Sequence, residues 1–65
     1  MTKEQKLSEA KVKLINLEDL VASLQTSRIL ANRLGYTDFA EQLAIKEDMF
    51  ESKSAVLETE IHNLI

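Results

Sequence analysis

This 65-residue sequence has no cysteine, no proline and a single glycine. The missing cysteines exclude disulfides, and one histidine is too few for a zinc site of the Cys/His type. A chain this short buries only about 60% of its unfolded surface, so its stability alone is marginal. Small domains usually add disulfides, metals or oligomerisation. Oligomerisation is the route that remains, and we expect a homo-oligomer, most simply a homodimer.

Long apolar runs are also missing. No apolar stretch approaches the ~20 residues that span a bilayer. The N-terminal segment Met1–Lys6 is followed by mixed charged residues rather than by the apolar core of a secretory signal. The absence of cysteine fits a reducing compartment. We therefore expect a cytoplasmic protein without membrane contact.

The lone glycine marks the expected turn, just past the midpoint of the chain. Gly35 is the natural residue to follow a helix C-terminus because it adopts left-handed conformations freely. Arg33 precedes it, where a cation favours the helix dipole. Thr37 or Asp38 is expected to cap the next helix, and Asp38 with Glu41 has the spacing of a capping box. The alternative is one continuous helix through Gly35, which costs only about 1 kcal/mol.

Apolar residues recur at helical spacing on both sides of this turn. The pattern predicts a helix over about residues 2–34, a turn at 35–37 and a helix over about residues 38–64. A turn this short makes the helices antiparallel neighbours, so the expected fold is all-α. Residues 1–65 then form a single helical-hairpin domain. The expected seam comprises Leu7, Ala10, Leu14, Leu17, Val21, Leu24 and Ala31 on the first helix, and Ala40, Leu43, Phe50, Leu57, Ile61 and Leu64 on the second.

Further apolar residues widen each seam and need a second cover. A lone pair of long helices encloses no core, and two hairpins closed by symmetry form a four-helix bundle. We therefore expect the hairpin to dimerise into such a bundle. The widening residues are Leu20 and Leu34 on the first helix and Phe39, Met49 and Val56 on the second.

Three polar residues interrupt the seam. Glu47 and Ser54 do so in the second helix, and Arg28 in the first. Arg28 is expected either to pair with a glutamate such as Glu47, or to reach solvent by its long stem. A third alternative is a polar cavity, closed by a second subunit, that takes an anionic small ligand. Ser27 allows a separate short helix after it, but good helix formers on both sides favour one continuous helix.

Charge is distributed unevenly between the two helices. The first 35 residues have a balance of +2 and the remaining 30 a balance of −5, which favours pairing of the two helices. If residues whose numbers sum to about 71 lie at one level of the hairpin, apolar meets apolar along most of its length. Lys11 and Lys13 then lie beside Glu60 and Glu58.

Catalytic equipment is sparse, and we expect no enzyme, no cofactor and no metal site. His62 is the only imidazole and has no nucleophile beside it. The acidic residues Glu47, Asp48 and Glu51 lack the Glu-x-x-His motif of bundle di-metal sites, so they are interpreted as a solvated face. The residues 31–38 look like the turn of a helix-turn-helix, but an acidic second helix with out-of-phase apolar residues is unfavourable for DNA.

RNA is the second candidate partner. Lys3, Lys6, Lys11 and Lys13 offer a basic patch, although the simpler interpretation is solubility and pairing with the acidic helix. In length and in its plan of two long helices the chain is similar to the Rop family of plasmid copy-number regulators, and its opening Met1-Thr2-Lys3 matches as well. That resemblance implies a dimeric four-helix bundle that binds paired RNA loops, and it transfers no functional residue.

A protein partner is the first candidate. Arg28, Arg33, Tyr36 and Phe39 gather toward the turn, and arginine and aromatic residues dominate binding hot spots. The alternative is that Tyr36 and Phe39 plug the bundle end. We expect a small non-enzymatic protein that self-associates and modulates, most simply by inhibition, a larger host protein, as small regulators of phage and mobile elements do. A Rop-like RNA-binding bundle and a structural oligomerisation module are the alternatives.

Overall fold

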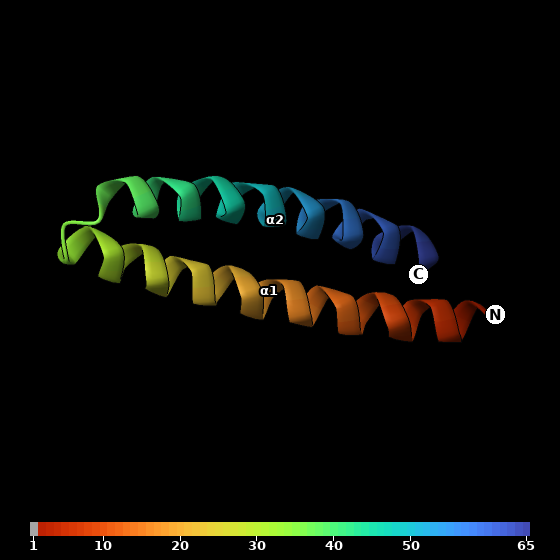
Figure 1. Cartoon of the computed structure of the whole chain (residues 1–65). Coiled ribbons are helices and arrows are strands. Elements are labelled where there is room, and N and C mark those ends of the chain that lie inside the picture. Colours follow the sequence, from red (N-terminus) through yellow and green to blue (C-terminus); the bar gives the residue numbers. More distant parts are fainter. Residues whose placement is uncertain (1) are drawn as a thin grey trace.

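The computed structural model describes residues 2–65 and consists of two α-helices packed antiparallel. Helix α1 spans Lys3–Arg33 and helix α2 spans Thr37–Leu64, so each observed bound lies within one residue of the prediction. The molecule measures 49 × 14 × 14 Å, and the start of α1 and the end of α2 lie opposite the turn (Figure 1). The predicted helical hairpin is confirmed. Met1, part of the opening tripeptide, lies outside the described residues.

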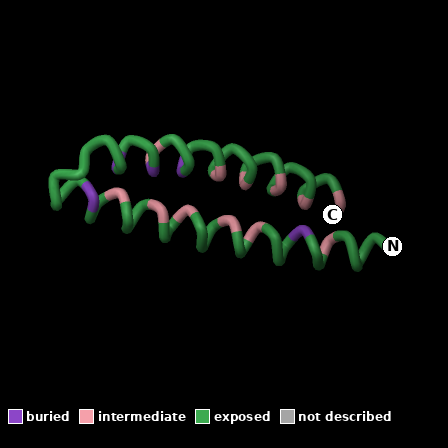
Figure 2. The backbone as a smooth tube through the Cα atoms, viewed as in Figure 1, coloured by how far each residue is buried: buried purple, intermediate pink, exposed green. Residues whose placement is uncertain are grey.

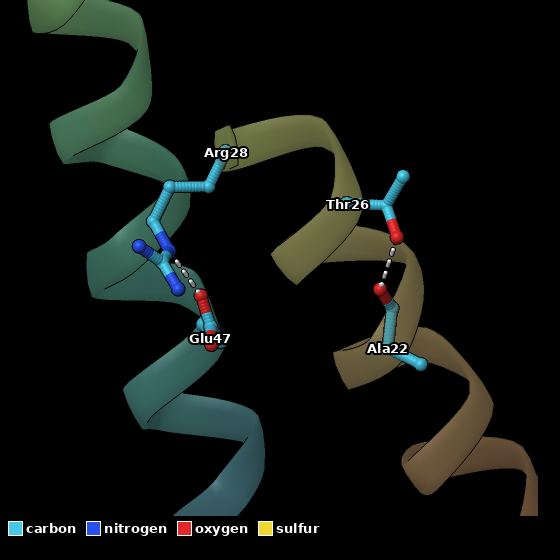
Figure 3. Close-up of polar contacts among 4 residues, drawn as sticks. All are labelled: Ala22, Thr26, Arg28 and Glu47. Atoms are coloured by element: carbon cyan, nitrogen blue, oxygen red, sulfur yellow. Dashed lines mark hydrogen bonds and ion pairs between the residues drawn. The ribbon is translucent and has the colours of Figure 1, made fainter. Parts of the chain in front are cut away.

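Helix α1 continues without a break through its polar stretch, so no separate short helix begins after Ser27. The Thr26 hydroxyl donates a hydrogen bond of 3.1 Å to the carbonyl oxygen of Ala22, one turn earlier (Figure 3). That bond satisfies the hydroxyl within its own helix. The preference for one continuous helix is confirmed.

A capping box that the sequence analysis did not identify begins α1. The Gln5 backbone N–H donates to the Thr2 hydroxyl at 3.2 Å, and the Thr2 backbone N–H donates to Oε1 of Gln5 at 3.0 Å. Two of the backbone donors that a helix start leaves free are thereby satisfied. The spacing Thr-x-x-Gln is the sequence signal for this cap.

The turn closes α1 with a Schellman motif centred on glycine. Gly35 adopts a φ of +87°, the left-handed region that only glycine enters without strain. Its N–H donates to the carbonyl oxygen of Asn32 at 3.1 Å, and the Tyr36 N–H donates to that of Ala31 at 2.9 Å. These are the two bonds that define the motif. They explain why the chain reverses here instead of continuing as one rod.

The predicted cap of α2 is wrong. Neither Thr37 nor Asp38 caps the helix, because both already lie inside its first turn and Tyr36 occupies the capping position without a side-chain bond. The Ala40 N–H instead donates to the carbonyl oxygen of Tyr36 at 2.9 Å. The reason is the Schellman closure, which consumes only Leu34–Tyr36 and lets α2 begin one residue earlier than predicted. Asp38 then favours the helix dipole without capping.

The predicted seam is buried between the helices. Every seam residue expected from the spacing is buried or half-buried, on the facing sides of α1 and α2 (Figure 2). The tightest part lies near the turn, where Ala31, Ala40 and Leu43 form a buried cluster with Leu24 packed against it. Ala31 and Ala40 thus meet as the predicted register requires.

The hairpin leaves much apolar surface uncovered. No large side chain is fully buried among residues 2–65. Twelve large apolar or aromatic side chains in that range are exposed, although single exposed ones are normal in a soluble protein. They are Val12, Ile15, Leu20, Ile29, Leu30, Leu34, Tyr36, Phe39, Ile45, Met49, Val56 and Ile65.

Candidate functional site

The turn end of the hairpin carries two exposed aromatic side chains. Tyr36 is 64% exposed and Phe39 is 59% exposed, so neither packs into the seam of its own hairpin. Both line one open hollow together with Leu30 of α1 and Leu34, which follows α1. The Schellman turn brings this group together because it places Tyr36 three residues after the end of α1 and Phe39 in the first turn of α2.

Arg33 lies beside this hollow. It lines a neighbouring hollow on the outer side of α1 with Thr26 and Ile29, and Leu30 belongs to both hollows. Arg33 is exposed. The structure therefore brings three of the four predicted partner-binding residues to one end of the molecule. We call Leu30, Arg33, Leu34, Tyr36 and Phe39 the turn-end surface.

The fourth predicted residue, Arg28, lies in the seam. Its Nε donates a hydrogen bond to Oε2 of Glu47 at 2.8 Å, joining α1 to α2 (Figure 3). The Arg28 side chain is 34% exposed and that of Glu47 is 9% exposed. The pairing predicted as the first alternative for Arg28 is confirmed. Glu47 therefore does not belong to a solvated acidic face with Asp48 and Glu51, which corrects that interpretation.

The ion pair keeps Glu47 charged. The hydrogen bond from the Arg28 guanidinium lowers the pKa of the Glu47 carboxyl below its ordinary value of 4.5. Partial burial acts in the opposite direction, and the Gln25 side chain and the charge of Arg28 add to the lowering. A carboxylate that accepts such bonds is stabilised in its ionised form. Arg28 is thus committed to a contact within the hairpin.

One flank of the seam is acidic. A hollow on this side is lined by Glu18 and Gln25 of α1 and by Glu51 and Glu58 of α2, with small residues between them. We call this the acidic face. Ser54 lines the same hollow, and its hydroxyl is buried without a hydrogen-bond partner among residues 2–65.

The opposite flank of the seam is apolar. The hollow that contains Leu30, Leu34 and Phe39 shows that residues just before the seam positions of both helices share this side. In helical geometry the same side carries Leu20, Met49 and Val56. All of these side chains are exposed. We call the six residues Leu20, Leu30, Leu34, Phe39, Met49 and Val56 the leucine face.

Lysines border the leucine face. Lys53 lies over the ring of Phe50, with Nζ 5.6 Å from the ring centroid. Lys53 also lines an apolar hollow along α2 with Val56, Leu57 and Glu60. The methylene stem of a lysine covers apolar surface while its ammonium group stays in water. This side of the hairpin therefore combines apolar contact area with positive charge.

The predicted pairing of Lys11 with Glu60 and of Lys13 with Glu58 is wrong. The only ion pair within residues 2–65 is that of Arg28 with Glu47. Helical geometry places Lys11 on the acidic flank and Lys13 on the other, whereas Glu58 lines the acidic hollow and Glu60 the apolar one. Each predicted pair is thus divided by the seam, although its members lie at similar levels.

The four lysines predicted as a basic patch do not share one face. Lys6 and Lys13 lie seven residues apart on the leucine-face flank, while Lys11 lies on the acidic flank. Lys3 lies at the first residue of α1. A single RNA-binding stripe needs its cations on one side of the helix.

Residues 2–65 contain neither a metal-binding cluster nor a membrane-spanning helix. No cluster of three or more histidine or acidic side chains has an arrangement that could hold a metal ion. Neither helix is apolar enough along its length to cross a membrane.

Comparisons of the chain with protein-family models, with curated proteins and with solved structures find no match. The function proposed below therefore rests on the contacts, exposure and charge of this chain's own residues.

The leucine face is the feature that the sequence analysis missed. The spacing places Leu20 and Leu34 beside the first seam and Met49 and Val56 beside the second, but as two separate stripes. The two stripes form one face because the helices are antiparallel. In such a pair, the residues that directly precede the seam positions of both helices lie on the same side. Applied to this sequence, that rule separates an apolar face from an acidic one.

Proposed function

We propose that this chain is a non-enzymatic helical module that self-associates and binds a larger protein through its turn end, modulating that protein's activity. The observation that carries the proposal is the exposure of Tyr36 beside Arg33 at the turn, with Phe39 next to them. Tyrosine and arginine are the residues that most often supply binding energy at protein interfaces. None of the three is needed to bury the seam of the hairpin.

Self-association is supported by the uncovered apolar surface. Tightly packed domains bury their large side chains fully, whereas this hairpin buries none of them fully within residues 2–65. A hairpin 49 Å long and 14 Å wide offers one long face to a partner. Covering that face with a second hairpin would produce the enclosed core of a four-helix bundle.

The test separates partner binding from folding and assembly. Wild-type chain immobilised at its N-terminus is used to capture proteins from a lysate of the source cells, and captured proteins are identified by mass spectrometry. Arg33→Ala and Tyr36→Ala are expected to lose the captured protein, because they remove the charge and the aromatic ring of the turn-end surface. Purified target is then titrated with each variant to measure modulation of its activity.

Ile45→Ala is the matched control. Ile45 is about as exposed as Phe39 but lies on the outer side of α2, away from the turn. It is expected to retain the captured protein at wild-type level. If Arg33→Ala and Tyr36→Ala bind as well as Ile45→Ala, while all three keep the wild-type fold and oligomeric mass, the turn end is not the binding site.

A further inference from the structure

We infer that a second copy of the chain docks on the leucine face with its turn at the same end, so that α1 of each copy lies against α2 of the other. The inference rests on the self-association proposed above and adds the face and the direction of the contact. A two-fold axis along the length of the bundle relates the copies. Each residue then meets partner residues of its own level.

The levels follow from the buried cluster near the turn. Ala31 and Ala40 pack together there, so residues equally far from them along α1 and α2 lie at one level. Leu20 is eleven residues before Ala31, and Glu51 is eleven residues after Ala40. Leu20 is therefore level with Glu51 and its neighbour Ser52.

In this arrangement Leu20 lies level with the turn-side end of an apolar hollow on the partner copy. The apolar hollow along α2 begins at Ser52 and Lys53 and continues past Val56. Residues at this helical spacing form the holes that receive a side chain from a facing helix. Leu20, exposed on α1, reaches the hollow of the partner copy, and the partner's Leu20 reaches this one.

The next contact toward the turn pairs a large side chain with a small one. Met49 is nine residues after Ala40, which sets it level with Ala22, nine residues before Ala31. Its neighbour Ser23 lies on the leucine-face side of α1 in helical geometry. A small serine opposite the partner's Met49 leaves room for the long thioether chain, which adapts to irregular gaps.

Charge favours the same direction. Helix α1 carries six basic and four acidic side chains, whereas α2 carries two basic and seven acidic ones. Placing α1 against the partner's α2 joins helices of opposite net charge. It also brings Lys13 near the level of the partner's Glu60, on the same flank. One exposed pair contributes little to affinity, but the attraction between the two helices favours this direction of docking.

The reverse direction is unfavourable. If the turn of one hairpin lies at the free end of the other, α2 packs antiparallel against the partner's α2. The midpoint of α2 lies near Phe50, so residues equally far on either side of Phe50 meet. Lys46 would then approach the partner's Lys53, and two helices with the same excess of acidic side chains would lie side by side. Leu34 and Phe39 would face the charged free end instead of apolar side chains. Like-charge contacts are a common means by which interfaces reject wrong arrangements.

The acidic face is a poor alternative for docking. Glu18, Glu51 and Glu58 line its hollow. A two-fold contact through this face would bring these glutamates against the same glutamates of the second copy. The leucine face runs from the turn to Leu20 and Val56 along the 49 Å hairpin, so a second copy docked there makes a long apolar contact. In that dimer Leu34 of each copy and Phe39 of the other cover each other at the turn end. Arg33, on the outer side of α1, and Tyr36 remain accessible and form one composite surface from two copies.

The face is tested by two glutamate substitutions and analytical ultracentrifugation. Leu20→Glu is expected to raise the dimer dissociation constant by roughly 100-fold or more, because a symmetric dimer loses the contact twice. Ile15→Glu is the matched control, since Ile15 is also exposed on α1 but lies on the acidic flank. It is expected to leave the dissociation constant within a few fold of wild type. The opposite ranking of the two variants overturns the assignment of the face.

The direction is tested by distances between spin labels. The chain has no cysteine, so one introduced thiol is the only labelling site. Labels on Thr37→Cys are expected within about 25 Å of each other across the dimer, because packed helices lie 8–10 Å apart. In the reverse arrangement they lie near the full 49 Å length of the hairpin. Asp48→Cys, exposed near the middle of α2 and away from the leucine face, is the reference and gives a short distance in both arrangements.

Each outcome has a distinct meaning. A dimer with a short Thr37 distance and a selective Leu20→Glu effect supports the inference. A dimer with a long Thr37 distance overturns the direction and leaves self-association standing. A wild-type chain that sediments as a folded monomer at all concentrations overturns the proposed self-association and the inference with it.

Discussion

Nε of Arg28 lies 2.8 Å from Oε2 of Glu47, in a seam whose next positions along both helices are apolar. Glu47 is the only buried charged residue within residues 2–65. Sliding α2 along α1 would leave this carboxylate buried without a cation, which is strongly unfavourable. The pair therefore specifies which level of α1 meets which level of α2.

Removing one partner of this pair is expected to destabilise the hairpin more than removing both. Arg28→Leu or Glu47→Leu alone leaves a charge facing apolar residues, whereas the double variant replaces the pair by packed leucine side chains. We expect each single variant to unfold at lower temperature than the double variant. Thermal unfolding followed by circular dichroism at equal chain concentration measures the ranking. Equal melting temperatures for all three variants would show that the interaction between Arg28 and Glu47 contributes nothing to stability.

Acid is expected to weaken the pair. Because the pKa of Glu47 is lowered in the folded chain, its ionisation stabilises the fold above the ordinary value of 4.5. That contribution is lost as the pH falls from 4.5 through the lower folded pKa. The stability difference between wild type and the Arg28→Leu/Glu47→Leu double variant should therefore shift toward the double variant in this window. Urea unfolding at pH 7 and at steps below the ordinary carboxyl pKa measures the shift.

Gly35 is expected to be required for its conformation and not for space. A β-carbon placed on this residue would have no atom of a non-neighbouring residue within 4 Å, so Gly35→Ala meets no steric clash, but the φ of +87° strains any residue that has a β-carbon. We expect Gly35→Ala to lower the free energy of unfolding by about 1–2 kcal/mol. Gly35→Asn should lose less, since asparagine tolerates left-handed conformations better. Urea unfolding compares the two, and equal losses would contradict this explanation.

The two threonines that precede or begin the helices are expected to behave differently. Thr2→Ala removes the capping bond to Gln5 and should destabilise the start of α1 by about 0.5–2 kcal/mol. Thr37→Ala removes no capping bond, so it should leave the start of α2 unchanged or slightly more stable. Amide hydrogen exchange in the first turn of each helix distinguishes them. Faster exchange in the first turn of α2 in Thr37→Ala would show that the Thr37 side chain caps this helix, as the spacing predicts.

Ser54 is expected to tolerate loss of its hydroxyl. The buried oxygen has no partner among residues 2–65, so Ser54→Ala should raise the free energy of unfolding by up to about 1 kcal/mol. Ser52→Ala is the control, because the Ser52 hydroxyl is exposed and bonds the Asp48 carbonyl oxygen at 3.1 Å. A loss of stability in Ser54→Ala, but not in Ser52→Ala, would show that the hydroxyl makes a stabilising contact in solution.

The hairpin is readable from the sequence because two strong signals agree. The four-three spacing of apolar residues identifies the seam of each helix, and Gly35 identifies the only position that reverses the chain. The pairing of Arg28 with Glu47 is also predicted from the sequence and confirmed, because each interrupts an otherwise apolar seam. These inferences depend on spacing along one helix or on a single exceptional residue.

The predictions that were wrong, the cap of α2 and the lysine–glutamate pairs, depend on the turn and on how the two helices are rotated relative to each other. Thr37 and Asp38 are good caps by type, but the backbone bonds of Tyr36 determine where α2 begins. Lys11 and Glu60 lie at similar levels, yet on different sides of the seam. The side on which a residue lies requires the relative rotation of the helices, which spacing within one helix does not contain. The exposed fractions of Tyr36 and Phe39 likewise follow only from the packed hairpin.

The first turn of α1 and the last turn of α2 lie at one end of the hairpin, and the connection between the helices lies at the other (Figure 1). A domain fused to either terminus would be attached at the end of the hairpin opposite the turn. The hairpin would then act as a stiff spacer that holds Arg33 and Tyr36 about 49 Å from its attachment point. Reporter fusions at the N-terminus and at the C-terminus should therefore be interchangeable and leave the opposite pole free.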